Sequence, residues 1–378
     1  MKLVALIAAH NEESTIRSTL LSLLAQERTL DRIVVAVDNC TDGTLAAVRS
    51  VHGVVAFETR DNTAKKPGAL NQAWRRHCRD ADLIVCLDAD TTLVPTAVGD
   101  WEREFVENPL LGGCSAKFTM LVSEEMDFKE RLLVRLQRAE FAKWTDVALQ
   151  RGRRTSVLAG TACCIRNQAL REVLDLRGNE AAAGPWIETS MVEDFELTYR
   201  MRSLGWETKV SATVRAYTDA MTDLRSLWAQ RMKWQTGTVR DLTQFGVNRL
   251  TRYDWWQQAQ GLLSLIARTL WVTLLVATIA MGHFQLQPLW IVAPVLFLLN
   301  DVKQAFRIPD RRPADILTAA AMIPQEFFAF MRAGWFTLSW SRFLDDWAFG
   351  RDPTDHWSLQ AEAESRRRTA TPALPLAS

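Results

Sequence analysis

The sequence Leu83-Ile84-Val85-Cys86-Leu87-Asp88-Ala89-Asp90 joins an apolar run directly to two carboxylates. The run predicts a buried strand. Because side chains alternate along a strand, Asp88 and Asp90 share one face and Ala89 points away. Two such carboxylates repel each other unless a cation joins them, and hard oxygen ligands suit Mg²⁺ or Mn²⁺. The simpler interpretation is a strand that ends in an acidic, solvated turn.

The sequence before this stretch alternates between strand and helix patterns. Apolar runs predict strands at 3–9, 33–37, 54–57 and 83–87, and helical spacing predicts helices at 14–26, 44–51 and 69–78. Such alternation predicts a parallel sheet with right-handed crossovers, in which ligands lie beyond the carboxyl ends of the strands. Asn11-Glu12, Asp38 and Asp88 to Asp90 follow three of these strands, so we expect them along the same edge of the sheet.

The following region, to about residue 245, has a mixed pattern. It predicts strands at 112–120, 155–166 and 207–217, and helices at 127–149, 193–204 and 224–244. The helix at 193–204 begins with Glu193-Asp194, and carboxylates there suit the positive end of the helix dipole. We therefore predict one α/β catalytic domain over residues 1–245.

Composition excludes several classes of protein. The chain has 378 residues and a formal net charge of +1, which argues against nucleic-acid binding by bulk electrostatics. None of the six cysteines forms a CxxC pair, so a zinc or dithiol motif is not expected, and their apolar surroundings fit free thiols in a reducing compartment. The short apolar run at 1–9 predicts a core strand rather than a signal peptide.

The sequence becomes strongly apolar after about residue 261. Spans are predicted at about 261–281 and 285–300 within a helical membrane region over 246–345, and basic residues flank the pair on both outer sides. This arrangement predicts a hairpin whose two ends, and the catalytic domain with them, are cytoplasmic. The stretch 315–344 fits an interfacial amphipathic helix or a third span. Core helices of a soluble domain are the alternative, and residues 346–378 read as a polar, disordered tail.

Further polar motifs accompany the opening carboxylates, and each has a structural alternative. The motif Ala9-His10-Asn11-Glu12 could bind a nucleoside or cap a helix. Lys66, at a helix start beside free backbone donors, could meet a phosphate or lie in a solvated turn. Gln230-Arg231-Met232-Lys233-Trp234 offers hydrogen-bond donors and a flat aromatic face, although an amphipathic helix at a membrane surface has similar residues.

The order and spacing of these motifs are more specific than any one of them. From about Leu3 to Trp234 the series resembles the family-2 glycosyltransferases of GT-A fold, a Rossmann-like, mostly parallel sheet flanked by helices. It is most similar to their membrane-embedded branch, which includes cellulose, chitin, hyaluronan and poly-N-acetylglucosamine synthases. The resemblance implies a GT-A catalytic domain followed by a C-terminal α-helical membrane region.

The resemblance also implies roles for individual residues. The nucleotide-sugar set would comprise Ala9, His10, Glu12, Asp38, Lys66, Asp88 and Ala89. Asp90 would bind the metal that bridges the diphosphate, with Asp88 as a nucleotide contact or second ligand. Asp194, with Glu193 beside it, would be the general base. The acceptor sugar and the leaving diphosphate would be held by Gln230, Arg231, Lys233 and Trp234, with Gly160 and Thr161 near the acceptor.

The implied reaction is inverting transfer from a nucleotide sugar, with a UDP-sugar as the expected donor and Mg²⁺ or Mn²⁺ as the cofactor. The sequence departs from the family pattern at Ala8 and His10, where Pro and Tyr are usual, and at Lys233, where a second Arg is usual. No hydrophobic segment precedes the catalytic domain, and the few spans suggest self-association into a homo-oligomer or transfer of a single sugar to a polyprenyl phosphate or protein. An inactive nucleotide-binding membrane scaffold is a further alternative. Partners are therefore a nucleotide sugar, a glycan, lipid or protein acceptor, and membrane lipids, but no nucleic acid.

Overall fold

The computed structural model describes residues 1–178, 184–285, 287–351 and 355–370. The chain forms two compact units. The first contains Met1–Met126 and Trp144–Ala220, and the second contains Asp127–Lys143 and Met221–Ser365. Helix α5 (Phe128–Gln150) contributes to both units.

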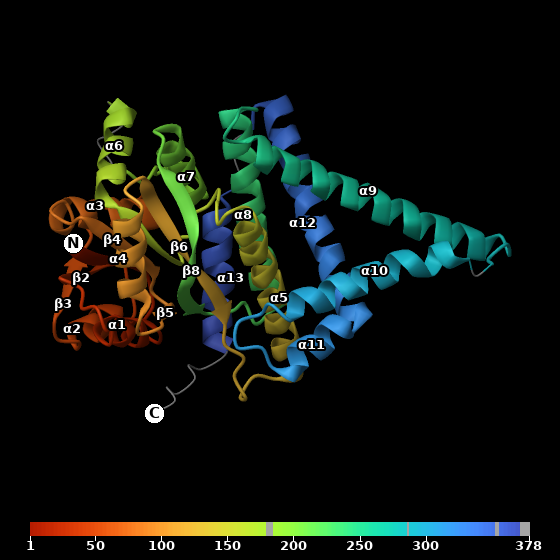
Figure 1. The fold of residues 1–378 in the computed structure, drawn as a ribbon, viewed down its shortest axis with the longest axis horizontal. Helices are drawn as coiled ribbons and strands as arrows, with labels where there is room; N and C mark the ends of the chain where they lie inside the picture. Colours follow the sequence, from red (N-terminus) through yellow and green to blue (C-terminus); the bar gives the residue numbers. More distant parts are fainter. Residues whose placement is uncertain (179–183, 286, 352–354, 371–378) are drawn as a thin grey trace. The chain divides into compact units, whose positions relative to one another are not determined.

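The first unit is built from alternating strands and helices (Figure 1). Its elements are β1 (Leu3–Ala9), α1 (Ile16–Leu24), β2 (Arg32–Val37), α2 (Thr44–Arg49), β3 (Val54–Glu58), α3 (Lys65–His77), β4 (Leu83–Asp88), β5 (Thr92–Leu93), α4 (Ala97–Glu107), β6 (Leu111–Met120), β7 (Ala162–Arg166), α6 (Asn167–Arg177), α7 (Glu193–Ser203) and β8 (Glu207–Thr218).

The strands form one sheet in the order β3-β2-β1-β4-β7-β6-β8-β5. The first four in this order are parallel, β7 is antiparallel to both of its neighbours, and β6 and β8 are parallel to each other. This is a mostly parallel sheet with helices on its faces, as the sequence predicted. The order places β1 between β2 and β4, so the ends of these three strands are adjacent.

Helices cover both faces of the sheet and complete two separate apolar cores. One core combines side chains of α1, α2 and α4 with one face of the strands, including the fully buried Ile16 and Trp101. The other combines α3, α6 and α7 with the opposite face, including Trp74 and Met201. The alternating apolar pattern of the strands therefore fills both cores, as expected for a parallel sheet covered on both sides.

The predicted strand over 155–166 is the main departure in this unit. Only Ala162–Arg166 forms β7, and the segment before it turns through Ala159 and Gly160, where the Ala162 N–H donates to the Ala159 carbonyl at 3.2 Å. Small residues cannot fill a sheet face but allow a close turn. The other predicted strands and helices agree with the observed ranges to within a few residues, whereas β5, α4 and α6 were not predicted from the sequence.

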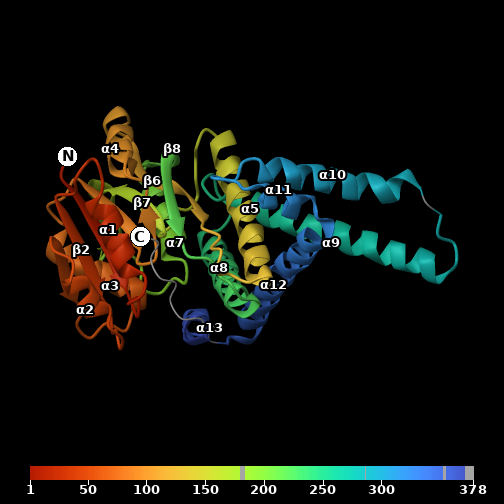
Figure 2. The ribbon, with the colours of Figure 1, turned by 90° about the horizontal axis from the view of Figure 1, so that it is seen from below.

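The second unit is helical. Besides its part of α5, its elements are α8 (Leu224–Phe245), α9 (Arg252–Ala280), α10 (Pro288–Ala305), α11 (Pro313–Ala320), α12 (Met322–Phe349) and α13 (His356–Ala370). Helices α8 and α12 pack closely, because a Cβ on Gly334 would lie only 2.7 Å from the Trp228 ring. Helices α9 and α10 form a hairpin that opens away from its turn (Figure 1 and Figure 2), and the Trp271 and Trp290 rings lie 6.0 Å apart.

The helices of the second unit match the predicted membrane region only in part. In the part of the chain that the structure describes, one helix, Arg252–Ala280, is long and apolar enough to cross a membrane. The predicted second span corresponds to α10, and the stretch 315–344 divides into α11 and α12 at Ala321, a break that the apolar pattern does not mark. The predicted disordered tail contains α13, whereas its last residues, 371–378, lie outside the described part of the chain.

Candidate active site

The site begins at the carboxyl edge of β1, β2 and β4. Ala8 is paired in register with Asp88, and the Asp38 N–H donates to the Ala9 carbonyl at 2.9 Å. The ring nitrogen Nδ1 of His10 lies 2.7 Å from the carbonyl oxygen of Asp38. The expectation that these strand ends meet is therefore confirmed, because adjacent parallel strands carry their carboxyl ends to one edge.

Asp38 is held at this edge by a set of donors. Its Oδ1 accepts hydrogen bonds from Thr59 Oγ1 at 2.7 Å and from Asn62 Nδ2 at 2.8 Å, and the residue is 5% exposed. Neither Thr59 nor Asn62 is among the site residues expected from the sequence. A signal was present, since Asn62 stands just before the Lys66 motif, but its contact with Asp38 depends on the β2–β3 pairing.

Backbone strain marks the same strand ends. Asn11 and Asn39, which follow β1 and β2 closely, have φ angles of 56° and 49°, and Lys65 at the start of α3 has 55°. Non-glycine residues seldom adopt this left-handed conformation, although Asn does so more readily than most. Such strain often accompanies functional sites. Near this edge, Glu12 Oε2 accepts a hydrogen bond from Thr15 Oγ1 at 2.7 Å, which is a turn contact.

Lys66 links the nucleotide side of the predicted site to the predicted base. Its ammonium donates to Asp88 Oδ1 and lies 4.0 Å from Glu193 Oε1. Burial lowers the pKa of Lys66, but the charges of Asp88, Glu193 and Asp194 outweigh it and raise the pKa well above its usual range. Lys66 is therefore charged at all ordinary pH values and holds these carboxylates together.

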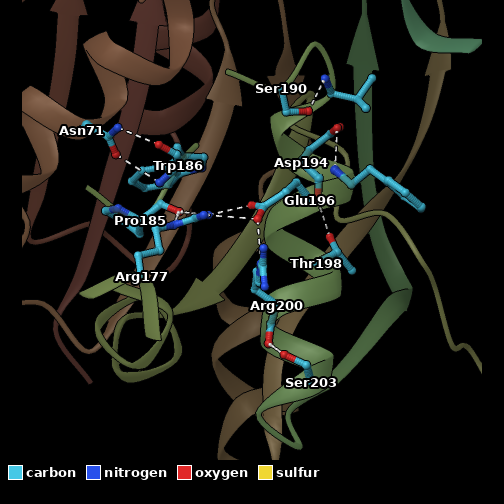
Figure 3. Close-up of polar contacts among 12 residues, drawn as sticks. Asn71, Arg177, Pro185, Trp186, Ser190, Asp194, Glu196, Thr198, Arg200 and Ser203 are labelled. Atoms are coloured by element: carbon cyan, nitrogen blue, oxygen red, sulfur yellow. Dashed lines mark hydrogen bonds and ion pairs between the residues drawn. The ribbon is translucent and has the colours of Figure 1, made fainter. Parts of the chain in front are cut away.

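Asp194 occupies the first turn of α7 and is tied to the turn before β7. Its Oδ2 accepts from the Gly160 N–H at 3.3 Å. Its backbone carbonyl accepts from Thr198 Oγ1 at 2.6 Å (Figure 3). Thr198 Oγ1 also accepts from the Leu158 N–H at 2.8 Å. These bonds fix the orientation of the carboxylate against Gly160, and the helix N-terminus favours its negative charge.

Gly160 and Thr161 complete this arrangement. A Cβ on Gly160 would lie 2.9 Å from the Lys66 ammonium, so only glycine leaves that ammonium undisturbed. The Thr161 carbonyl accepts from the Asp88 N–H at 3.1 Å. The predicted acceptor turn therefore contacts the Asp194 carboxylate and the backbone of Asp88.

The segment that leads into α7 is anchored by residues that sequence reasoning missed. Asn71 in α3 exchanges two hydrogen bonds with the backbone of Trp186, at 2.8 and 3.1 Å (Figure 3). Arg177 and Glu196 form a buried ion pair at 2.6 Å, and Arg177 Nη2 also donates to the Pro185 carbonyl at 2.9 Å. Asn71 stands five positions after Lys66, but its partner lies over a hundred positions later in the chain, and spacing alone does not reveal that contact.

Asp90 lies in a strongly negative environment. Burial raises its pKa well above the usual range, the charges of Asp88, Asp219 and Glu12 raise it further, and a hydrogen bond from Thr91 opposes them. Asp219 directly follows β8 and was not predicted from sequence. Its approach to Asp90 depends on the β5–β8 pairing, which joins Thr92 to Tyr217.

A divalent cation would relieve this repulsion, and the oxygen donors of Asp88 and Asp90 are the type that Mg²⁺ and Mn²⁺ prefer. Within the described ranges, no group of three or more His, Cys, Asp or Glu side chains is arranged to hold a metal. Mg²⁺ in phosphate-transfer sites commonly uses one or two carboxylates plus substrate phosphates. The donor set therefore fits a metal whose remaining ligands come from a bound diphosphate.

The last motif lies on α8 in the second unit and forms a packed cluster there. Arg231 is 3% exposed, and its Nη2 lies 2.9 Å from Glu140 Oε2. Its guanidinium lies 4.4 Å from the Trp234 ring centroid and 5.4 Å from that of Phe141. The Arg231 guanidinium thus supports the Trp234 ring. Lys233, on the same helix, is also buried, with 7% of its surface exposed.

Comparisons with known proteins identify the family and agree with the fold. Residues 2–237 match the family described as "Glycosyltransferase like family 2". The chain is 24% identical over 237 residues to a poly-β-1,6-N-acetyl-D-glucosamine synthase of Staphylococcus aureus strain COL, covering 61% of this chain and 53% of that protein. The corresponding synthase of Staphylococcus epidermidis is 23% identical over 239 residues, with the same coverage. The chain thus spans about half the length of the curated relatives it matches.

A solved structure also resembles the fold. The mannosyltransferase PcManGT of Pyrobaculum calidifontis, in complex with GDP-Man and Mn²⁺, superposes with a TM-score of 0.53 at 17% identity, covering 86% of this chain and 87% of that one. At this identity the likeness concerns the fold alone, and it is a GT-A-like fold. The chain belongs to glycosyltransferase family 2 and is a glycosyltransferase.

Proposed function

We propose that this glycosyltransferase transfers a sugar from a nucleotide sugar, with a UDP-sugar as the expected donor, by an inverting, metal-dependent reaction. The observation that carries the proposal is the Lys66 ammonium, which contacts Asp88 at the strand edge and approaches Glu193 beside Asp194. A donor site and a base are thereby supported by one cation. The acceptor is proposed to be a glycan, a lipid or a protein at a membrane.

The proposed chemistry is a single displacement. Asp194 takes the proton from the acceptor hydroxyl while that oxygen forms a bond to the anomeric carbon. The bond from the anomeric carbon to the diphosphate oxygen breaks, and the diphosphate leaves with the electron pair. A metal held by Asp90 and Asp88 would neutralise the charge of the diphosphate. One displacement inverts the anomeric centre, so an α-linked donor gives a β-linked product.

The other site residues have supporting roles in this proposal. Ala9, Glu12 and Asp38 would bind the nucleoside, with His10 and Ala89 beside them. Trp234 would pack against the acceptor sugar, and Gln230 and Lys233 would meet polar groups of the acceptor or diphosphate. The buried Arg231 would orient Trp234 through stacking.

The membrane placement rests on the apolar helices of the second unit. Helix α9 is proposed to span the bilayer with α10 as its returning partner, which leaves the catalytic unit on the cytoplasmic side. Large apolar side chains remain exposed on these helices, among them Leu263 at 65% and Leu296 at 60%. Surface of this kind is typical of a lipid contact. Self-association in the membrane is part of the proposal, and detection of monomer alone in detergent at all working concentrations would exclude it.

The test is a donor screen on the full-length protein with membranes present, scoring nucleotide release with Mn²⁺, with Mg²⁺ and with a chelator. The names of the relatives make N-acetylglucosamine and mannose donors the first to include. Asp194→Asn should bind nucleotide normally but lose transfer by at least about a hundredfold, the usual contribution of a general base. Asp175→Asn on the exposed face of α6 is the matched control. Full transfer by Asp194→Asn would remove Asp194 as the base.

Product analysis separates the acceptor alternatives. A ladder or polymer indicates processive synthesis, and a single addition indicates transfer to one lipid or protein site. Nucleotide binding with no turnover of any donor would instead support a scaffold.

A further inference from the structure

The Asp38 carboxylate is held asymmetrically at the end of β2. Its Oδ1 accepts hydrogen bonds from Thr59 Oγ1 at 2.7 Å and from Asn62 Nδ2 at 2.8 Å, and Asn39 Nδ2 lies 3.3 Å from the same oxygen. A carboxylate oxygen offers about two lone-pair positions, so these donors fill Oδ1. Oδ2 accepts no hydrogen bond from any residue that the structure describes. One oxygen of Asp38 is therefore committed to the protein, and the other is left for a ligand.

Asn62 is itself fixed in one orientation. Its Nδ2 also donates to the Lys65 carbonyl at 2.8 Å, and its Oδ1 accepts from the Ala64 N–H at 3.1 Å. Turning the amide over would set its oxygen against the Asp38 carboxylate and the Lys65 carbonyl, which are both acceptors. A Cβ on Gly68 would collide with Asn62 Oδ1, so glycine at that position leaves room for the amide. The donation from Asn62 to Asp38 is thereby fixed.

Thr59 supplies the other donor from the neighbouring strand. It directly follows β3, and its N–H donates to the Val37 carbonyl at 3.1 Å. The pairing of β2 with β3 thus sets the Thr59 hydroxyl beside Asp38, which is 5% exposed. A charged acceptor strengthens such hydrogen bonds, so a hydroxyl and an amide are enough to hold this carboxylate in place.

Uracil and guanine present different donors to a carboxylate held in this way. Uracil offers a single N–H, at N3, between two carbonyl oxygens, so it suits one acceptor oxygen and is repelled by a second. Guanine offers N1–H and an adjacent amino group, which together suit both oxygens of one carboxylate. Because Oδ1 of Asp38 is filled by protein donors, the guanine amino group would lack its acceptor. A buried donor left unpaired weakens binding strongly.

We propose that Thr59 and Asn62 are positioning residues for base selection, which fill Asp38 Oδ1, leave Oδ2 as the single acceptor, and thereby select uracil over guanine. This inference rests on the proposed function, which assigns Asp38 to the nucleoside. It adds the residues that decide which base Asp38 accepts. Asp38 contacts the base in this proposal, and Thr59 and Asn62 act through Asp38.

The test measures nucleotide binding and needs no sugar transfer. The full-length protein is titrated in a calorimeter with UDP, with GDP and with 3-methyl-UDP, in which a methyl group replaces the N3 hydrogen. The wild type should bind UDP at least roughly tenfold more tightly than either of the others, because one charge-assisted hydrogen bond is lost in each case. Equal binding of UDP and GDP, or of UDP and 3-methyl-UDP, would overturn the proposal.

Thr59→Val separates base selection from simple damage to the site. Valine keeps the shape of threonine but removes the hydroxyl, so Oδ1 regains a lone pair that can meet the guanine amino group. The preference for UDP over GDP should shrink by roughly tenfold, the effect of one charge-assisted hydrogen bond. A merely structural role would weaken both nucleotides by the same factor, and an unchanged or larger preference would therefore overturn the proposal. Thr59→Ser keeps the hydroxyl and should retain the wild-type preference.

Asn62→Ser tests the second donor. Serine can still accept from the Ala64 N–H, as hydroxyls do in turns of this kind, but it is too short to reach Asp38. The preference for UDP should again shrink, and a wild-type preference in this variant would remove Asn62 from the proposal. Thr208→Val is the matched control, because its hydroxyl is lost from β8 of the same sheet but donates to the Thr155 carbonyl at 2.7 Å. An equal change of preference in Thr208→Val would overturn the proposal.

The outcome is separable from the transfer reaction. A preference for UDP that depends on Thr59, in a protein that transfers no sugar, would support this inference and refute the proposed function. Transfer from a GDP-sugar as efficient as transfer from the matching UDP-sugar would leave a transferase in place and refute the base selection.

Discussion

The buried ion pair between Arg231 and Glu140 gives the sharpest prediction. Both side chains are almost fully buried, at 3% and 4% exposed, and Glu140 Oε2 accepts hydrogen bonds from Arg231 Nε and Nη2 at 3.2 and 2.9 Å. Removing one partner leaves an uncompensated buried charge, which costs about 3–5 kcal/mol. Glu140→Ala should therefore destabilise the helical unit by about that amount.

Glu140→Ala should also affect the position of the Trp234 ring. Without Glu140, the Arg231 guanidinium loses its anchor and its position 4.4 Å from the Trp234 ring. Thermal unfolding followed by tryptophan fluorescence should show a Tm lowered by at least about 6 °C, taking about 2 °C per kcal/mol for a domain of this size. A larger KM for acceptor should accompany it.

The double variant Glu140→Leu with Arg231→Met supplies the control. Apolar replacement of both partners often costs little, because no charge is left buried. It should recover most of the stability but not the acceptor KM, since the support of Trp234 is still missing. If Glu140→Ala unfolds at the wild-type temperature, the pair does not contribute as described.

Three further predictions concern the catalytic unit. Gly160→Ala should change stability little but weaken nucleotide-sugar turnover roughly tenfold, as expected when one charge-assisted contact is lost. The added Cβ would lie only 2.9 Å from the Lys66 ammonium and would push that ammonium aside. Steady-state kinetics would measure the change in turnover. Asn71→Ala should leave the backbone groups of Trp186 unsatisfied, at about 1–3 kcal/mol per group, and should raise hydrogen exchange at the Trp186 amide. Burial raises the pKa of Cys78 from 9.0 to about 12, so its contribution to stability should be complete below pH about 9 and lost as the pH rises towards about 12; denaturation midpoints measured across this range should fall less in Cys78→Ala.

Each of these has an outcome that contradicts it. Gly99→Ala, in the first turn of α4 with its nearest contact at 3.5 Å, should be neutral or stabilising, so an equal loss of turnover there would deny a special role to Gly160. Unchanged exchange at Trp186 would show that Asn71 does not hold the segment. An identical alkaline profile in Cys78→Ala would assign the loss to other groups.

The sequence predicted the first half of the sheet well because its signals were local. The apolar runs ending in Asp38 and Asp88 mark parallel strands, and parallel strands place their ends together. The contacts of Asp38 with Thr59 and Asn62 were not predictable in the same way. They depend on which strands pair, and pairing is a long-range property that the period of a single strand does not contain.

The same reason explains the differences farther along the chain. Arg231 was predicted from sequence as a donor to the leaving diphosphate, but its buried ion pair with Glu140 in another helix gives no signal by spacing. Asp219 gives no signal by spacing, because β5 and β8 pair across more than a hundred residues. Contacts that depend on a distant partner are therefore the ones that sequence reasoning missed.

The antiparallel strand β7 has a consequence for handling the protein. Its register sets Cys163 opposite Cys86 of β4 and Cys164 opposite Cys114 of β6, and all four thiols are buried once the sheet is complete. In the unfolded chain these thiols are exposed and free to couple in any combination. Refolding from denaturant in air should therefore yield cross-linked, inactive material, whereas a reductant present until the sheet closes should restore the yield, because the closed sheet then shields the thiols from oxidants.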